Sequence, residues 1–182
     1  MPDRWLDEGL LLLSEFGING VRIDRLANRL GLTKGSFYHH FPGMSGYRLA
    51  LLDHYERRYT TRYIDLAERG GSVDPAAKLE ALIAAVSADI EDSDDIEVAI
   101  RAWAAKDDDA RSTMERVDRI RMNYLAGLLA ALSPDRGDAE LWSRTMYLTL
   151  IGASHVFPPL PVADIRTIYD RLLAIIGIGV PA

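Results

Sequence analysis

A short polar run at residues 33–39 carries side chains suited to contact with nucleic acid. The Thr33 hydroxyl and the free backbone N–H groups at the start of a helix suit a phosphate. Lys34 projects from the first turn of that helix and can reach either a phosphate or a guanine edge. Ser36 can donate to or accept from a base edge. Gly35 has no side chain and lets the helix approach DNA closely.

Three short helices, predicted at residues 3–16, 22–30 and 33–40, must position this run. Each carries apolar residues at helical spacing. Gly31 lies between the second and third helices, where a left-handed C-cap is expected, and Thr33 predicts an N-cap. The spacing is that of a helix-turn-helix unit. Helical hairpins with glycine turns are also common as purely structural units, so the pattern by itself leaves both interpretations open.

The rest of the chain also has helical periodicity and contains no convincing strand pattern. The predicted class is all-α, with about nine helices. The further helices are expected at residues 45–69, 75–91, 96–105, 108–132, 138–157 and 163–176. Residues 70–72 (Gly-Gly-Ser), Ser133-Pro134 and the prolines at 158, 159 and 161 are the expected stops.

The literal sequence of the turn and third helix is more specific than its pattern. Residues 31–41 read GLTKGSFYHHF, and Leu26-Ala27 and Phe16-Gly17 precede them. This run closely resembles the recognition-helix signature of the TetR (tetracycline-repressor) family, and the resemblance is strong over residues 5–55. In that family, Tyr38 and His39 would correspond to a pair that contacts phosphates.

The resemblance implies a division of labour within the chain. Residues 1–44 would form a helix-turn-helix DNA-binding domain. Residues 45–182 would bind a small effector and dimerise. Three departures from the family pattern predict modest DNA affinity and a weak dependence on salt. First, Arg22 stands where the second helix usually has a hydroxyl N-cap, although this arginine can contact a phosphate. Second, Met44 stands where the family usually has a lysine. Third, no basic arm precedes the first helix.

Charge and composition exclude several classes of protein. Residues 1–63 contain nine Lys or Arg and seven Asp or Glu, whereas the whole chain has a net charge of −6. A strongly basic nucleic-acid binder is therefore excluded, and a mildly basic contact end on an acidic body remains. The absence of cysteine excludes disulfides, a thiol nucleophile and thiolate-bound metals. No apolar run is long enough to span a membrane and no signal peptide is evident, so we expect a cytoplasmic protein.

An effector pocket is expected among the later helices, where large polar groups interrupt apolar faces. The same residue types at helical spacing are more often part of an ordinary helical core. The candidates for ligand binding are Trp103, Arg121, Tyr124, Tyr147, Ile151 and His155.

The last two helices are the expected dimer interface. On the 138–157 helix, the shared face holds Leu141, Thr145, Leu148, Gly152 and His155, with Ala153 beside it; the final helix contributes Ile165, Ile168, Leu172 and Ile175. Two such helices from each of two chains would form a four-helix bundle at a twofold axis. A single chain could instead bury these stripes internally.

The expected function is a ligand-responsive transcriptional regulator, most simply a repressor, that binds a pseudo-palindromic operator on double-stranded DNA as a homodimer. The alternative is a helical small-molecule-binding protein with weak or lost DNA recognition. No catalytic constellation, metal site or cofactor motif is predicted. The acidic clusters at residues 92–95 and 107–109 lack the pattern of a calcium loop.

Overall fold

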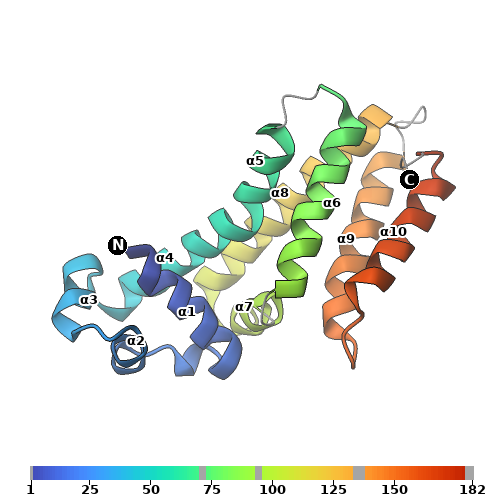
Figure 1. The fold of residues 1–182 in the computed structure, drawn as a ribbon. Helices are drawn as coiled ribbons and strands as arrows, with labels where there is room; N and C mark the ends of the chain where they lie inside the picture. The colour runs from blue at the N-terminus through green and yellow to red at the C-terminus, as the bar shows by residue number, and fades with distance from the viewer. Residues whose placement is uncertain (1, 70–72, 93–95, 133–137, 179–182) are drawn as a thin grey trace. The chain divides into compact units, whose positions relative to one another are not determined.

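The computed structural model describes residues 2–69, 73–92, 96–132 and 138–178, and these residues form helices and connections without a strand (Figure 1). The α-helices are α1 (Pro2–Phe16), α2 (Ile23–Leu30), α3 (Lys34–His40), α4 (Gly43–Glu56), α5 (Arg62–Arg69), α6 (Pro75–Asp92), α7 (Ile96–Ala104), α8 (Asp108–Leu132), α9 (Ala139–His155) and α10 (Val162–Ile175).

Two other helical turns complete this description. A 3₁₀ turn, η1 (Ile18–Gly20), precedes α2, and a π-helical turn, η2 (Arg57–Thr61), joins α4 directly to α5. The stretch from Gly43 to Arg69 is therefore the single long helix predicted from sequence, and counting it once gives nine helices in the described part of the chain. The predicted stops at 70–72 and at Ser133-Pro134 lie outside the described residues.

The chain divides into two compact units. The first, unit 1, comprises the chain up to Tyr59 together with residues 93–116; the second, unit 2, comprises residues 60–92 and the chain from Val117 onward. The structural division therefore falls inside η2 and inside α8, whereas the predicted functional division follows Met44. In unit 1, α1 packs against α2, α4 and α7, so a helix remote in sequence completes the N-terminal bundle.

An aromatic cluster forms the centre of unit 1. The Phe37 ring lies 5.5 Å from that of Trp5 and 5.2 Å from that of Tyr47, and all three residues are almost fully buried. The Tyr47 hydroxyl donates to the Trp5 carbonyl oxygen at 2.6 Å. Burial raises the pKa of Tyr47, so the hydroxyl keeps its proton for this bond. Close approach of α1 to α4 depends on Gly9, because a Cβ there would lie 1.9 Å from the Tyr47 hydroxyl oxygen.

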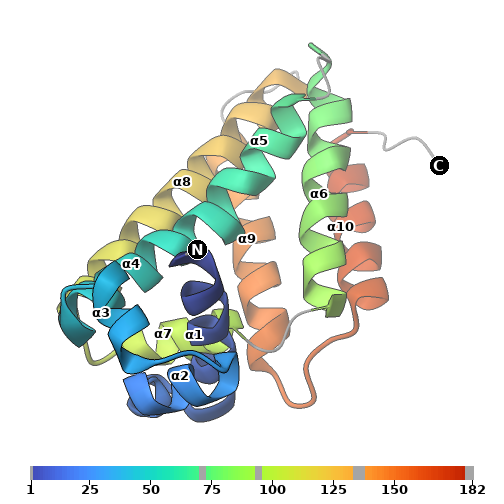
Figure 2. The same ribbon diagram turned by 60° about the vertical axis from the view of Figure 1, so that its left-hand side comes forward.

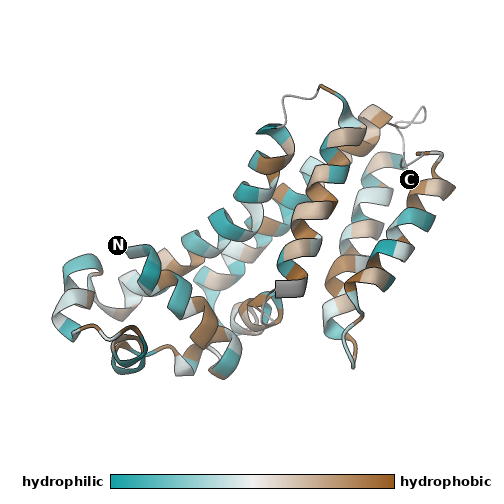
Figure 3. Cartoon of the chain, viewed as in Figure 1, coloured by the Kyte–Doolittle hydropathy of each residue, from teal (hydrophilic) through white to brown (hydrophobic). Residues whose placement is uncertain are grey.

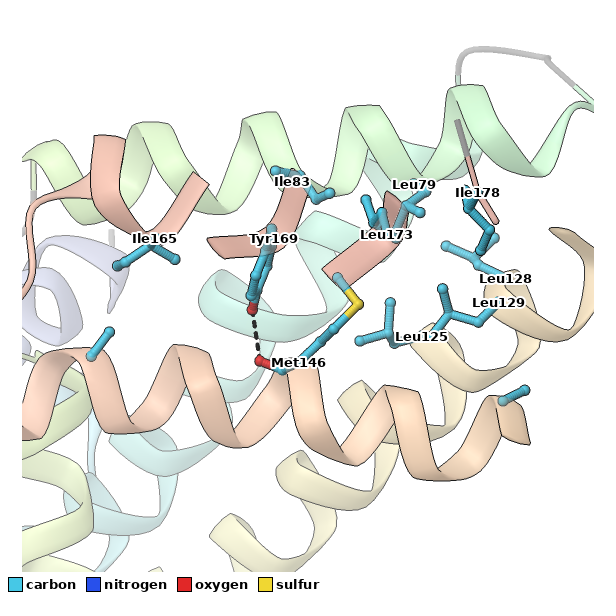
Figure 4. Packing of buried hydrophobic residues seen from close by; sticks show 12 residues of the cluster. Leu79, Ile83, Leu125, Leu128, Leu129, Met146, Ile165, Tyr169, Leu173 and Ile178 are labelled. Carbon is cyan, nitrogen blue, oxygen red and sulfur yellow. Dashed lines mark hydrogen bonds between the residues drawn. The ribbon is translucent and has the colours of Figure 1, made fainter. Parts of the chain in front are cut away.

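Unit 2 is built around a separate apolar core. Helix α10 packs against α9 and α6, and Figure 2 shows these helices from a second direction. Both polar and apolar residues occur along α5 and α6 (Figure 3), and amphipathic helices place the two kinds on different faces. Tyr169 on α10 lies within the core, and its hydroxyl donates to the Met146 carbonyl oxygen on α9 at 2.8 Å (Figure 4). None of the described helices is both long and apolar enough to cross a membrane.

Candidate nucleic-acid interface

The turn between α2 and α3 has the geometry that the sequence predicts. Gly31 adopts a left-handed conformation with φ 65°, which glycine favours because it has no Cβ. The Leu32 N–H donates to the Ala27 carbonyl oxygen at 2.9 Å. Thr33 caps α3, because its hydroxyl oxygen accepts a hydrogen bond from the Ser36 N–H at 3.2 Å. The direction of α3 is therefore fixed at its first residue.

Helix α3 buries one side and exposes the other. Phe37 is fully buried, whereas the adjacent Tyr38 is 60% exposed. The residues predicted to contact DNA lie mainly on the exposed side: Thr33, Lys34, Gly35, Tyr38 and His39 are exposed and Ser36 is half-buried. Because Phe37 anchors α3 in the aromatic cluster, the exposed groups project from a rigid support.

Arg22 is exposed and immediately precedes α2. It makes no side-chain cap on the helix, and its Nε donates instead to the Asn19 carbonyl oxygen at 2.9 Å. The sequence predicts that α2 has no hydroxyl N-cap, and the structure shows no side-chain cap there. Met44, where the family pattern has a lysine, is half-buried in the first turn of α4.

Ion pairs within unit 1 hold several of its cations. Arg29 Nε lies 2.6 Å from a Glu8 carboxylate oxygen on α1, and Arg29 NH1 donates to Glu15 at 2.7 Å. Lys34 on α3 pairs with Asp24 on α2, and the hydrogen bond from Lys34 to Asp24 raises the pKa of the lysine. These acidic partners were absent from the predicted site. Their sequence separations follow no helical spacing that would have identified them.

Residues 6–50 match the family described as "Bacterial regulatory proteins, tetR family". This segment is a TetR-family domain. It spans α1 to α3 and the first half of α4, and so contains every predicted DNA contact.

The chain is also similar to individual proteins, in sequence over part of its length and in fold over most of it. The chain is 38% identical over 71 residues to the transcriptional regulator AcuR of Cereibacter sphaeroides, a match that covers 39% of this chain and 32% of the relative. The fold resembles that of E. coli NemR in its reduced form, with a TM-score of 0.68, 22% identity, and coverage of 91% of this chain and 95% of that one. A transcriptional regulator from Rhodococcus sp. Rha1 has a TM-score of 0.68 and 21% identity, with both chains fully covered.

The predicted ligand-binding residues fall into both units. Trp103 is buried in unit 1 and its indole hydrogen-bonds with Asp107, whereas the other five candidates belong to unit 2. In unit 2, Arg121 Nε donates to the buried Thr60 hydroxyl at 3.0 Å, and its NH1 donates to the Tyr147 hydroxyl at 3.3 Å. The structure therefore brings Arg121 and Tyr147 together, with Thr60 as a partner that the sequence did not identify.

The other three candidates in unit 2 are more dispersed. The Tyr124 hydroxyl donates to Glu68 at 2.8 Å. His155 is exposed at the end of α9, and its Nδ1 lies 2.8 Å from the carbonyl oxygen of the half-buried Ile151. Among these candidates, Arg121 and Tyr147 are the two whose side chains hydrogen-bond with each other. Tyr147 also donates to Asp118 at 2.7 Å, which places a carboxylate beside the guanidinium group.

The predicted dimer face on α9 and α10 is partly exposed and partly buried. Leu148 is 66% exposed and Ile175 is 70% exposed, and a Cβ on Gly152 would meet no atom within 4 Å. Ala153 and Ile165, which were predicted to lie at the interface, belong instead to the internal core of unit 2. One side of α9 and one side of α10 face that core, where the two helices pack against each other.

Proposed function

We propose that the protein is a ligand-responsive transcriptional regulator, most simply a repressor, that binds a pseudo-palindromic operator as a homodimer. The observation that carries the proposal is the geometry of α3: Phe37 is fully buried, Thr33 caps the helix, and the side chains facing outward are those of the TetR-family segment. A rigid, outward-facing helix is what the major groove of B-DNA accepts. In this proposal the protein is a regulator and not an enzyme, and it works in the cytoplasm.

The exposed groups divide between positioning and sequence recognition. Thr33, Tyr38, His39 and Arg22 contact phosphates and fix the orientation of α3. Lys34 and Ser36 meet base edges, and Gly35 allows the backbone to come close to them. A metal is not needed for this contact, and among the described residues no three His, Asp or Glu side chains lie close enough together to hold one.

Dimerisation uses the exposed faces of α9 and α10. Leu141, Leu148 and Ile175 are large apolar side chains exposed in the single chain. A twofold axis through these helices would bury them and place the two α3 helices about 34–36 Å apart, facing successive major grooves.

Effector response follows from a shift between two populations. We place the effector in unit 2, against Arg121 and Tyr147. It lowers DNA affinity only if it binds more tightly to the form of the protein that does not fit the operator than to the form that does.

A specific observation supports the alternative, a helical small-molecule-binding protein with weak or lost DNA recognition. Lys34, the one Lys or Arg of α3, is paired with Asp24, and Met44 offers no charge to a phosphate. Both features lower the electrostatic part of DNA binding.

Selection of bound sequences from random duplexes tests the two functions directly. The proposed function predicts recovery of an inverted repeat. Tyr38→Ala and Lys34→Ala should then weaken binding to that repeat while sedimentation shows an unchanged dimer. Failure to enrich any sequence, with no binding to duplex DNA even at low salt, would select the alternative.

A further inference from the structure

One ion pair lies within the proposed DNA-contacting surface itself. Lys34 is the first residue of α3, and its ammonium group pairs with the Asp24 carboxylate in the first turn of α2. The Lys34 side chain is 64% exposed and that of Asp24 is 70% exposed. Both charged groups are therefore exposed to solvent on the surface where DNA would bind, and the pairing buries neither of them.

The pair differs from the other ion pairs of the α1–α3 bundle. Arg29 is held by Glu8, whose side chain is only 15% exposed, and by Glu15, so it ties α2 to α1. Arg25 lies over the Phe16 ring, 4.2 Å from its centroid. Those contacts support the fold. An ion pair as exposed as that of Lys34 and Asp24 contributes little to stability, so its main effect is on what the lysine can bind.

The chemistry of the two groups distinguishes between the partners available on DNA. An ammonium group has three N–H donors, so Lys34 can keep one bond to Asp24 and still donate to two acceptors. A guanine edge offers two neutral acceptors, O6 and N7. A phosphate carries a negative charge and is repelled by the Asp24 carboxylate beside the lysine.

From this geometry we propose that Asp24 is a specificity-determining residue, which biases Lys34 toward a neutral base edge and away from backbone phosphates. The proposal rests on the proposed function and extends it, because it assigns the partner of Lys34. Phosphate contacts are the same at every sequence, whereas base contacts are not. Asp24 therefore lowers binding to non-operator DNA more than binding to the operator.

The deciding experiment measures the affinity of the full chain for the selected operator and for a duplex of random sequence, across about 50–200 mM salt. Asp24→Asn removes the charge and keeps the shape. It should raise affinity for the random duplex about twofold to fivefold, in keeping with the strength of an exposed ion pair. It should steepen the salt dependence by about 0.9 as Lys34 gains a phosphate, and lower the ratio of operator to random binding.

Two matched variants and one background separate this effect from general charge repulsion. Asp24→Glu keeps the carboxylate and should behave as the wild type. Asp3→Asn removes an exposed acid from the first turn of α1 and should change neither the salt slope nor the ratio. In a Lys34→Ala background, Asp24→Asn should give no gain. Thermal unfolding of each variant reports whether the fold is kept.

The outcomes distinguish this proposal from the function on which it rests. An equal gain from Asp24→Asn in the wild-type and Lys34→Ala backgrounds would overturn the role of Asp24, since the acid would then act on DNA directly. An unchanged or reduced random-duplex affinity in Asp24→Asn would overturn it as well. After either of these two Asp24→Asn results, the proposed function still stands if Lys34→Ala and Tyr38→Ala weaken operator binding. If no variant and no wild-type chain binds DNA at the lowest salt, both proposals fail.

Discussion

Replacing Gly35 by alanine separates DNA contact from folding, because the structure predicts opposite effects on the two. A Cβ at position 35 would meet only the Thr33 hydroxyl oxygen, at 3.7 Å, which is an ordinary contact distance. The free protein thus has room for the methyl group. Alanine is favoured over glycine within a helix by up to about 1 kcal/mol, so the free energy of unfolding of Gly35→Ala should stay the same or rise.

DNA binding should change in the other direction. If Gly35 lies against the floor of the major groove, the added methyl group crowds a packed interface, which costs about 1–3 kcal/mol. Operator affinity should therefore fall about fivefold to 150-fold. Fluorescence anisotropy with the labelled operator measures the affinity, and urea unfolding measures the stability.

A matched control is available in unit 2. Gly127 lies on α8, is exposed, and would also accept a Cβ without any atom within 4 Å. Gly127→Ala should raise stability in the same way and leave operator affinity unchanged. If Gly35→Ala binds the operator as tightly as the wild type does, Gly35 does not face DNA, and the orientation proposed for α3 is wrong.

Three further predictions concern the rest of the chain. Gly9→Ala should lower the free energy of unfolding, measured in urea, by about 2 kcal/mol, because the new Cβ would displace the Tyr47 hydroxyl from its hydrogen bond to the Trp5 carbonyl oxygen. A loss below about 0.5 kcal/mol would contradict the close approach of α1 and α4. Leu148→Glu should shift the protein from dimer to monomer in sedimentation velocity, since a charge would be buried at the proposed interface, and an intact dimer would place that interface elsewhere. The Ala110 N–H donates to the Asp107 carboxylate at 3.0 Å, and this hydrogen bond lowers the pKa of Asp107 in the folded state. The ionised carboxylate therefore stabilises the fold fully above the pKa that Asp107 has in the unfolded chain, and this stabilisation is lost as the pH falls through its lower pKa in the folded protein. Asp107→Ala should therefore cost about 1 kcal/mol at pH 7 and much less at about pH 2, and an equal cost at both would refute the role of the charge.

The local structure of the chain could be predicted because it depends on neighbouring residues. Gly31 and Thr33 fix the turn before α3 through backbone conformation and capping, which act over a few residues. The predicted ends of most helices agree with the structure to within about two residues for the same reason. The buried Phe37 and the exposed Tyr38 follow from helical spacing.

Contacts between distant residues could not be predicted in this way. The pairing of Arg29 with Glu8 and Glu15, and of Lys34 with Asp24, depends on how whole helices are placed. The same is true of α7, whose Glu97 accepts from the buried Tyr55 hydroxyl on α4 and which packs along α1. Nothing in the local sequence of α7 indicates that it belongs with the N-terminal helices. The DNA contacts and the ligand residues themselves stay predictions.

The participation of α7 in unit 1 has a consequence for protein engineering. A chimera that takes its DNA specificity from this protein would ordinarily be joined at one point after α3 or α4. Such a graft would leave behind the helix that covers α1, and would either expose apolar surface or place α1 against a foreign partner. Transplanting unit 1 therefore requires three junctions, one in the long helix near Tyr59, one before α7 and one in α8 near Arg116, so that α7 moves together with the first segment.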